Sequence, residues 1–474
     1  MIVAYFKDFG VLKETGTEYW GIQIVNFLDC TFYFAMLTIA TVFLSEDLGL
    51  NDKQAGYSTA LFTSATSLML FVSGLYTDWL GIKKSLQLSM AAMLVLRLGV
   101  VVVGLVPTLP HRGLLASGLF LLMAPFMAGI QTVFQSSCQR FTTKRSRSAG
   151  FNLWYLFMNI GAAAAGFSID IVRKLLHLPN VHIFTMGVVT ALLCLVVGMT
   201  LIKREDQLVG PEEPPETKPD EAKVKHRPPW QAIREVIQEP TLWRLLVLVA
   251  LILGVRAVYA YMYLLMPKYW LRTIGEGAAI GTLNAINPIG IVIGLILIIP
   301  IANKLNVFSM LVYGAMVSAF ALFPLALPWQ WYSADIGTAH YWMALVCMVI
   351  LTLGEVLWSP KLYEFTAAIA PKGQEGTYLG LSLLPWFLAK TLVSAFSGHM
   401  LARWSPETVQ VNGAAIPLRQ AMINDQVPFW QSPAAMWLIL GVYALAGCII
   451  ASFLRGWLTQ GAHWKTKKDD DHGP

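Results

Sequence analysis

The chain has 474 residues, of which 56% are apolar and only 13% are charged, and its formal net charge is +6. Average soluble domains contain about 25% charged residues, so this composition excludes a soluble globular protein. The positive charge follows the orientation bias of membrane loops and requires no nucleic-acid partner. The composition therefore predicts an integral membrane protein with several spans.

Runs of about 20 apolar residues are typical of membrane-spanning helices. We predict twelve such spans, centred on residues 20–45, 57–79, 85–107, 114–139, 148–170, 182–202, 242–267, 277–302, 306–328, 339–370, 376–403 and 433–458. The short loops between them leave no room for a separate soluble catalytic domain. The predicted fold class is an all-α polytopic membrane protein built from two six-helix bundles.

A polar segment after the sixth span divides the chain into two halves. Its prolines, mixed charges and low hydrophobicity are typical of a flexible linker. We expect an N-terminal bundle at residues 1–203, a linker at 204–240, a C-terminal bundle at 241–460 and a tail at 461–474. Two bundles with equal numbers of spans are typical of transporters in which the bundles rock about a substrate site at the membrane midplane.

Basic residues in the short loops predict the orientation of the chain. Lys83, Lys84, Arg140 and Lys203 fall on the side that also holds both chain ends, whereas the opposite side holds fewer basic residues, such as Lys53. We therefore expect both termini in the cytoplasm, with no cleavable signal peptide before the first span. The expected location is the plasma membrane, or the inner membrane of a bacterium.

The loop between the second and third spans is the most informative stretch of the chain. It has the spacing G-x-x-x-D-x-x-G-x-K-K, formed by Gly74, Asp78, Gly81, Lys83 and Lys84. The glycines allow a tight turn and close helix approach, and the acid can accept charge-assisted hydrogen bonds from a neighbouring helix. An ordinary basic loop is the alternative interpretation.

This spacing resembles the corresponding cytoplasmic loop of major facilitator superfamily transporters. The resemblance implies the major facilitator fold and a gating role for the loop. Arg140 lies at a matching depth on the fourth span and is the partner that we expect for Asp78 when the cytoplasmic side is closed.

The spacing of the cysteines and histidines does not favour a metal site or redox chemistry. All five cysteines fall in apolar runs without C-x-x-C spacing, which predicts buried small side chains. The eight histidines show no metal-ligand spacing, and no Gly-rich phosphate loop precedes a lysine. We expect no cofactor, no metal and no ATP hydrolysis, and no nucleophile–base spacing suggests an enzyme.

Ionisable side chains within spans are costly in lipid and usually face a cavity. Five occur mid-span: Asp29, Arg97, Arg256, Glu355 and Lys390. The alternative is that they form structural pairs between helices. This alternative is strongest for Arg97, because the third span, which carries it, usually lies at the periphery of such a bundle. Lys361 and Glu364, three residues apart, are interpreted as a local ion pair, with a gating role left open.

Polar side chains recur at helical spacing on the same and neighbouring spans. They are Asn26, Asp29 and Tyr33 on the first span, Tyr155 and Asn159 on the fifth, Arg256, Tyr259 and Tyr263 on the seventh, and Asn284 and Asn287 on the eighth. Each row forms a stripe on its helix. Such stripes also bind helices to one another, but the charges on the same spans favour a hydrated, substrate-binding cavity.

Three segments resemble signatures of the proton-coupled oligopeptide transporter family. Residues 26–34 (Asn-Phe-Leu-Asp-Cys-Thr-Phe-Tyr-Phe) are similar to a degenerate E-x-x-E-R-F-x-Y-Y element, and residues 150–161 match the fifth-helix spacing F-x-x-x-Y-x-x-x-N-x-G. Residues 353–360 match the tenth-helix pattern L-G-E-x-x-x-S-P. The order of these segments agrees along nearly the whole chain, so it resembles a divergent relative of that family.

The chain also departs from the family pattern. Asn26, Asp29 and Cys30 stand where the family has two glutamates and an arginine, and the fourth-helix lysine has no counterpart around Gln131, which remains a candidate substrate contact. Two extra helices found between the halves of many bacterial members are absent. The family's acids, arginine and lysine are implicated in proton coupling and in binding the peptide carboxylate. Both functions are therefore left open here.

The resemblance implies a secondary active transporter that moves a small zwitterionic or anionic solute by alternating access, with proton symport as the energy source. Glu355 is expected to bind a substrate amine or carry the proton, with Asp29 as a second titrating acid. Arg256 and Lys390 are the expected anion-binding pair. The expected partners are a small-molecule substrate, protons as co-substrate and the lipid bilayer, and we expect a monomer. The alternatives are an uncoupled organic-anion uniporter or exchanger and a non-transporting membrane receptor.

Overall fold

The computed structural model describes residues 9–143, 145–204, 239–302, 306–369 and 384–460. The N-terminal half contains α2 (Thr17–Val42), α3 (Asp52–Leu80), α4 (Ile82–Leu105), α5 (Arg112–Arg140), α6 (Arg147–Asp170) and α7 (Val181–Thr200), with the short elements η1 (Phe9–Glu14), η2 (Phe43–Asp47) and η3 (Ile171–Leu175). The predicted tail at 461–474 and nearly all of the predicted linker at 204–240 lie outside the described residues.

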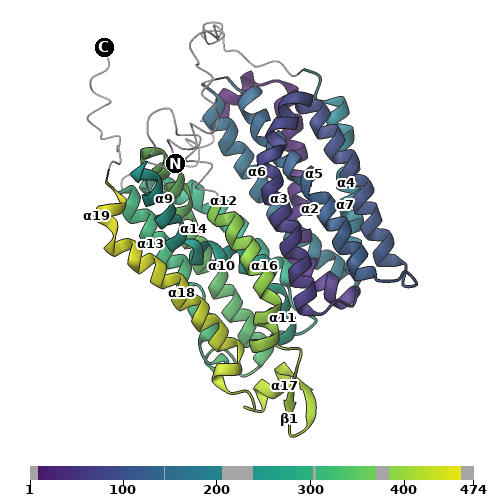
Figure 1. Cartoon of the computed structure of the whole chain (residues 1–474), viewed down its shortest axis with the longest axis vertical. Helices are drawn as coiled ribbons and strands as arrows, with labels where there is room; N and C mark the ends of the chain where they lie inside the picture. The colour runs from purple at the N-terminus through teal and green to yellow at the C-terminus, as the bar shows by residue number, and fades with distance from the viewer. Residues whose placement is uncertain (1–8, 144, 205–238, 303–305, 370–383, 461–474) are drawn as a thin grey trace.

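The C-terminal half repeats this helical organisation with more interruptions. Its main helices are α9 (Pro240–Leu251), α10 (Leu253–Leu264), α11 (Met266–Thr273), α12 (Ile280–Ala302), α13 (Val307–Phe320), α14 (Ile336–Ile369), α16 (Leu384–Trp404) and α18 (Pro433–Phe453). The short elements are η4 (Phe323–Ala326), η5 (Trp329–Trp331), α17 (Leu418–Ile423), η6 (Phe429–Gln431) and α19 (Arg455–Leu458). A hairpin of β1 (Thr408–Val411) and β2 (Ala414–Pro417) projects with α17 from one end of the bundle (Figure 1).

The two halves form separate helix bundles that lie side by side (Figure 1). Each bundle has its own apolar core, with Phe32, Phe120 and Phe184 in the first and Trp270 and Trp437 in the second. Large apolar side chains also cover the outside of the molecule. This is the distribution expected when the solvent is lipid rather than water.

In the described part of the chain, nine helices are long and apolar enough to cross a membrane, or up to ten if α9 and α10 count as one bent span. Helices α3 and α16 also lie in the bundles and are not among these. The all-α fold is confirmed. The count of twelve spans and the cytoplasmic location of both termini stay predictions.

The predicted seventh span is broken twice. Helices α9 and α10 meet at an angle of 44°. Gly447 of α18 packs against this break, where a Cβ atom would lie 2.0 Å from the carbonyl oxygen of Leu251. The second break, at Leu265, comes two residues before Pro267, which lacks a backbone N–H and crowds the preceding helical turn. The breaks leave α10 as a short, buried helix in the centre of the bundle.

Close helix crossings between the bundles use glycines. A Cβ atom on Gly281 of α12 would lie 1.9 Å from the carbonyl oxygen of Gly166 on α6. On the other seam, a Cβ atom on Gly398 of α16 would lie 2.3 Å from the carbonyl oxygen of Asp52 on α3. Small residues at helix crossings allow this backbone approach in membranes.

Both glycine crossings lie at the same end of the molecule, where α3 and α12 begin and α6 and α16 end. We call it the closed end, because polar contacts between the bundles gather there, as described below. The opposite end, where α7 ends and α9 begins, is called the linker end.

Candidate functional site

Glu355 lies on α14 at the interface between the two bundles. Asn287 of α12 donates from Nδ2 to Glu355 Oε2 at 2.9 Å and to Thr352 Oγ1 at 3.3 Å. The Glu355 side chain is half-buried, whereas Asn287 is almost completely buried. The acid is therefore held in one position but keeps part of its surface open to the interface.

Arg256 of α10 is the cation whose charge acts on this carboxylate. It interacts electrostatically with Glu355, and its guanidinium carbon lies 4.4 Å from the centre of the Trp358 ring. Only 7% of the residue is exposed, yet its Nε and Nη2 atoms have no hydrogen-bond partner in the part of the chain that the structure describes. Buried donors normally have partners, so these two N–H groups are available to a bound anion.

Aromatic residues form the walls around this acid and this cation. Tyr259 Oη and Ser318 Oγ are hydrogen-bonded at 2.8 Å, and Trp358 donates from Nε1 to Tyr259 Oη at 3.2 Å. The N-terminal bundle contributes Tyr155, which packs against apolar residues of α12 and α14. Because Tyr155 also interacts electrostatically with Glu355, the cluster faces the other bundle.

Lys390 of α16 is almost completely buried but stands apart from this cluster. Its Nζ atom lies 5.2 Å from the Trp386 ring centre and 5.6 Å from the Phe387 ring centre. Among the described residues it has no hydrogen bond and no ion pair. Sharing of one ligand between Lys390 and Arg256 therefore stays a prediction.

Asp29 and Arg97 form an ion pair inside the N-terminal bundle. Arg97 donates from Nη2 to Asp29 Oδ1 at 2.7 Å, and both side chains have 0% exposure. Arg97 also donates from Nη1 to Gly187 O at 3.0 Å and lies over the Phe32 ring. This geometry is the one that the structural interpretation of the pair expects, and a coupling role for Asp29 stays a prediction.

The remaining candidate residues divide between helix contacts and the interface. Asn26 donates to the carbonyl oxygen of Trp154 at 3.0 Å and so fastens α2 to α6 within one bundle. Asn159 donates to the carbonyl oxygen of Tyr155 on its own helix. Asn284 donates to Thr38 Oγ1 at 3.4 Å and thereby joins the two bundles. Tyr33 and Gln131 are half-buried.

The predicted gating loop forms the tight turn that its sequence indicates. Gly81 separates α3 from α4 with φ of 81°, a conformation that glycine adopts without strain. Gly74 has open space beside it, so it makes no close helix approach here. Arg140 is half-buried at the end of α5, but the Asp78 side chain lies outside the described side chains. Their pairing stays a prediction.

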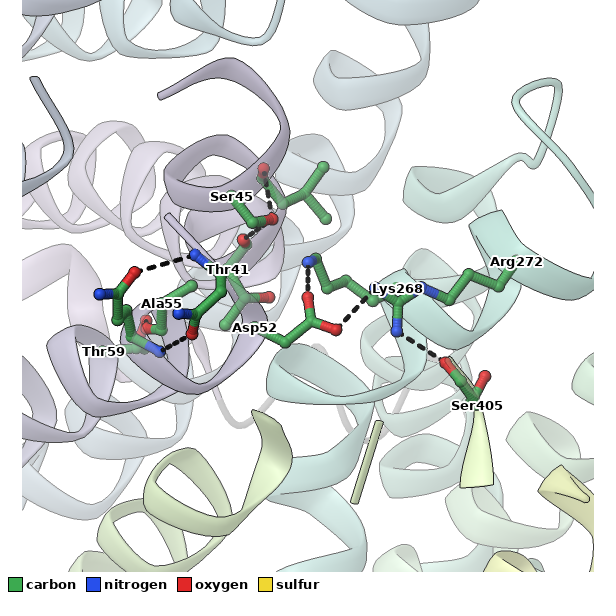
Figure 2. Close-up of polar contacts among 11 residues, drawn as sticks. Thr41, Ser45, Asp52, Ala55, Thr59, Lys268, Arg272 and Ser405 are labelled. Atoms are coloured by element: carbon green, nitrogen blue, oxygen red, sulfur yellow. Dashed lines mark hydrogen bonds and ion pairs between the residues drawn. The ribbon is translucent and has the colours of Figure 1, made fainter. Parts of the chain in front are cut away.

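A charged cluster at the closed end was not predicted from the sequence. Asp52 at the start of α3 accepts hydrogen bonds from Lys268 Nζ and, at 2.7 Å, from Arg272 Nη2, both on α11 (Figure 2). Arg272 also donates from Nη1 to the carbonyl oxygen of Ser405 at 2.6 Å. The four-residue spacing of Lys268 and Arg272 was the only signal of this cluster in the sequence.

A second polar contact closes the other seam at the same end. Asp170 at the end of α6 accepts from the backbone N–H groups of Gly281 at 3.0 Å and of Thr282 at 2.7 Å, at the start of α12. A carboxylate at a helix N-terminus is stabilised by the exposed N–H groups and the helix dipole. Each seam between the bundles is therefore fastened by one carboxylate of the N-terminal half. In contrast, Lys361 and Glu364 form a local pair on α14, with Nζ and Oε2 2.6 Å apart.

Replacing Asp52 with asparagine should open the closed end more often, because Lys268 would be left almost fully buried without its carboxylate. Glu46 also interacts electrostatically with Lys268 and Arg272, so we expect a population shift of about tenfold rather than complete opening. Spin-label distances between Thr108→Cys and Thr408→Cys, on opposite sides of the closed end, measure it.

Asp47→Asn is the matched control for this experiment. Asp47 lies at the same end but accepts its hydrogen bond from Asn180, at 2.7 Å, within the N-terminal bundle. A distance distribution that changes equally in Asp47→Asn and Asp52→Asn would contradict the role of Asp52 as a link between the bundles.

The model of the Major Facilitator Superfamily matches residues 22–406. A bacterial homologue of the human drug peptide transporters PepT1 and PepT2 has a similar fold, with a TM-score of 0.67 and 15% identity over 94% of this chain and 98% of that chain. No curated protein matches the sequence.

Two further solved structures carry ligands. A peptide transporter in complex with sulfate has a TM-score of 0.68 and 14% identity over 96% of this chain and 99% of that one. A POT family transporter in complex with 5-aminolevulinic acid has a TM-score of 0.67 and 13% identity over 95% of this chain and 100% of that one.

Proposed function

This chain belongs to the Major Facilitator Superfamily, and we propose that it moves a small zwitterionic or anionic organic solute by proton-coupled symport. Its predicted resemblance to oligopeptide transporters is confirmed in the fold. It is a transporter by family and a multi-pass protein of the plasma membrane, or of the inner membrane in a bacterium. The substrate class and the coupling to protons are the proposal.

The observation that carries the proposal is an acid and a cation that interact electrostatically at the interface between the bundles. Glu355 is held by Asn287, and Arg256 beside it has two buried N–H groups without partners in the described structure. An acid that can accept an ammonium group and a cation that can donate to a carboxylate suit a small zwitterion. The neighbours that bind sulfate and 5-aminolevulinic acid support a substrate of this size and charge.

Alternating access requires that the two bundles separate at one end while they meet at the other. The ion pairs of Asp52 and the helix-capping contact of Asp170 hold the closed end together in this conformation. We assign the closed end to the outside of the cell and the linker end to the cytoplasm. The loop around Asp78 would then close the linker end in the opposite conformation.

Proton coupling is assigned to Glu355. Burial favours the neutral form of a carboxyl group, and a nearby cation favours the charged form. A carboxyl group with both influences can take up and release a proton as the bundles move and its surroundings change. Arg256 supplies the cation, and the aromatic residues around the site supply the apolar surroundings.

An uncoupled exchanger of organic anions is the second candidate, and the Asp29–Arg97 pair favours it. Asp29 pairs with Arg97 inside the N-terminal bundle, away from Glu355 at the interface, so the two acids do not form one proton pathway in this conformation. Uptake into proteoliposomes separates the candidates: a symporter accumulates substrate when a pH gradient is applied, whereas an exchanger needs substrate inside the vesicle. A receptor would bind the solute without any uptake.

The substrate can be found by a thermal-shift screen of dipeptides, amino acids and carboxylates on the purified protein. A ligand at one hundred times its dissociation constant stabilises the folded state by about 2.7 kcal/mol. Stabilisation by zwitterions or anions supports the proposed substrate class, and stabilisation by cations alone contradicts it.

Arg256→Gln should weaken binding of the best zwitterionic or anionic ligand by roughly tenfold to one hundred and fifty-fold, because charge-assisted hydrogen bonds contribute about 1.5–3 kcal/mol. Isothermal titration measures the loss. Arg256→Lys keeps the charge but removes the planar group that lies over Trp358, so it should recover only part of the affinity.

Arg244→Gln is the matched control for Arg256. Arg244 is on α9 and donates to Gln460 at the linker end, away from the site. Equal losses of affinity in Arg244→Gln and Arg256→Gln would remove Arg256 from the binding site. A loss in Lys390→Gln as large as that in Arg256→Gln would instead support the predicted pair of cations.

A further inference from the structure

A pocket of about 610 Å³ lies on the outside of the molecule, at the closed end of the seam between α3 and α16. Its lining includes Lys53 from α3 and Phe396, His399, Met400, Arg403 and Trp404 from α16. Because α3 begins at Asp52 and α16 ends at Trp404, the pocket is at the level where a spanning helix meets the lipid headgroups.

The charges around this pocket are basic. Lys53 and Arg403 have exposed side chains, and no acidic residue is among the described residues that line the pocket. The neighbouring carboxylate of Asp52 is engaged by Lys268 and Arg272 (Figure 2). A similar pocket on the seam between α6 and α12 is lined by both Asp170 and Lys174, so a net basic lining distinguishes the first pocket.

The basic residues come from both bundles, and the closed end brings them together. Tyr57 of α3 and His399 of α16 are hydrogen-bonded, with Oη and Nε2 2.7 Å apart, and Gly398 packs against the backbone of Asp52. Closure therefore places Lys53 and Arg403 in the lining of one pocket, where their like charges repel each other. An anion between them would remove that repulsion and would favour the closed end.

An apolar track leads from the pocket along the seam. On α16, Phe396, Leu392 and Leu388 follow at four-residue spacing and are 53%, 42% and 50% exposed. On α3, Tyr57 and Leu61 are 52% and 54% exposed. A basic site at headgroup level that continues into an exposed apolar strip has the shape of a lipid-binding site, because a headgroup and its acyl chains require both parts.

We propose that this pocket binds the headgroup of an anionic phospholipid, whose phosphate bridges Lys53 of one bundle and Arg403 of the other and stabilises the closed end. The acyl chains lie along the track of Phe396, Leu392 and Leu388. The lipid acts as a ligand of one conformation, because Lys53 and Arg403 face the same pocket only while α3 and α16 are in contact at this end.

Binding can be measured by native mass spectrometry of the purified full-length protein with phosphatidylglycerol, phosphatidylcholine or soluble glycerol phosphate. We expect phosphatidylglycerol to be retained and the other two to be lost. Lys53→Gln or Arg403→Gln should each weaken retention about fivefold, since a basic residue near an anionic lipid surface contributes about 1 kcal/mol. Lys174→Gln, on the other seam, is the matched control and should retain the lipid like the wild type.

Three outcomes of this measurement overturn the proposal. Equal retention of phosphatidylcholine would show that the negative charge is not recognised. Equal binding of glycerol phosphate would show that the site takes a soluble anion rather than a lipid. A loss in Lys174→Gln as large as that in Lys53→Gln would show a general effect of surface charge.

The effect on conformation is measured separately, with the spin labels at Thr108→Cys and Thr408→Cys in nanodiscs. Adding phosphatidylglycerol to phosphatidylcholine should increase the closed-end population of the wild type and leave that of Lys53→Gln unchanged. In phosphatidylcholine alone, Lys53→Gln should be at least as closed as the wild type, because one of two repelling charges is gone. A more open Lys53→Gln in pure phosphatidylcholine would contradict the proposed repulsion. This measurement requires no transport substrate and is independent of the proposed function.

Discussion

Arg97→Met should destabilise the protein by about 3–5 kcal/mol, the usual effect of removing one partner of a buried ion pair. The substitution leaves Asp29, which has 0% exposure, without its cation. It also removes the hydrogen bond from Arg97 to Gly187 O, which joins α4 to α7. The effect is measured by heating the purified protein and determining the fraction that remains monodisperse at each temperature.

The double variant Asp29→Leu with Arg97→Met tests whether the pair is structural. Apolar replacement of a whole buried pair is often neutral or stabilising, so the double variant should recover most of the stability lost in Arg97→Met. If the pair only fastens helices, the double variant should also keep gradient-driven uptake. Recovered stability with lost accumulation would return Asp29 to the coupling role that the first-span resemblance implied.

This pair shows where sequence reasoning reaches its limit in a membrane protein. Apolar runs and mid-span charges are local properties, so the α-helical fold and the importance of Arg97, Asp29 and Glu355 follow from the sequence alone. Whether a mid-span charge points into its own bundle or toward the other one depends on how each helix is rotated and crossed. Asp29 and Asn26 lie on a polar stripe from which we predicted a cavity, yet the hydrogen bonds of both side chains join helices within one bundle.

The contacts at the closed end could not be predicted from the sequence, for a different reason. Asp52 and Lys268 are 216 positions apart, and their contact depends on how the two bundles pack against each other. No periodicity in either helix encodes that contact. Glu355 was easier to identify, because an acid in the middle of a span is rare and its segment resembles a known signature.

Glu355→Gln should abolish accumulation of substrate driven by a pH gradient, the largest functional effect that we expect from a single substitution. Glutamine keeps the size of the side chain and can still contact Asn287, which donates to Glu355 Oε2 at 2.9 Å. It cannot exchange a proton. Exchange of labelled substrate across the membrane without a gradient should remain measurable, because that step needs movement of the bundles but no net proton transfer.

Glu364→Gln is the matched control, since Glu364 lies on the same helix but is 52% exposed and paired with Lys361. It should accumulate substrate like the wild type. If Glu355 instead holds a substrate amine, Glu355→Gln should weaken binding and exchange together, and the loss should be smaller for ligands without an amine. Intact gradient-driven uptake in Glu355→Gln would exclude both roles. The acid of the Asp29–Arg97 pair would then be the remaining candidate for coupling, and its test is the double variant described above.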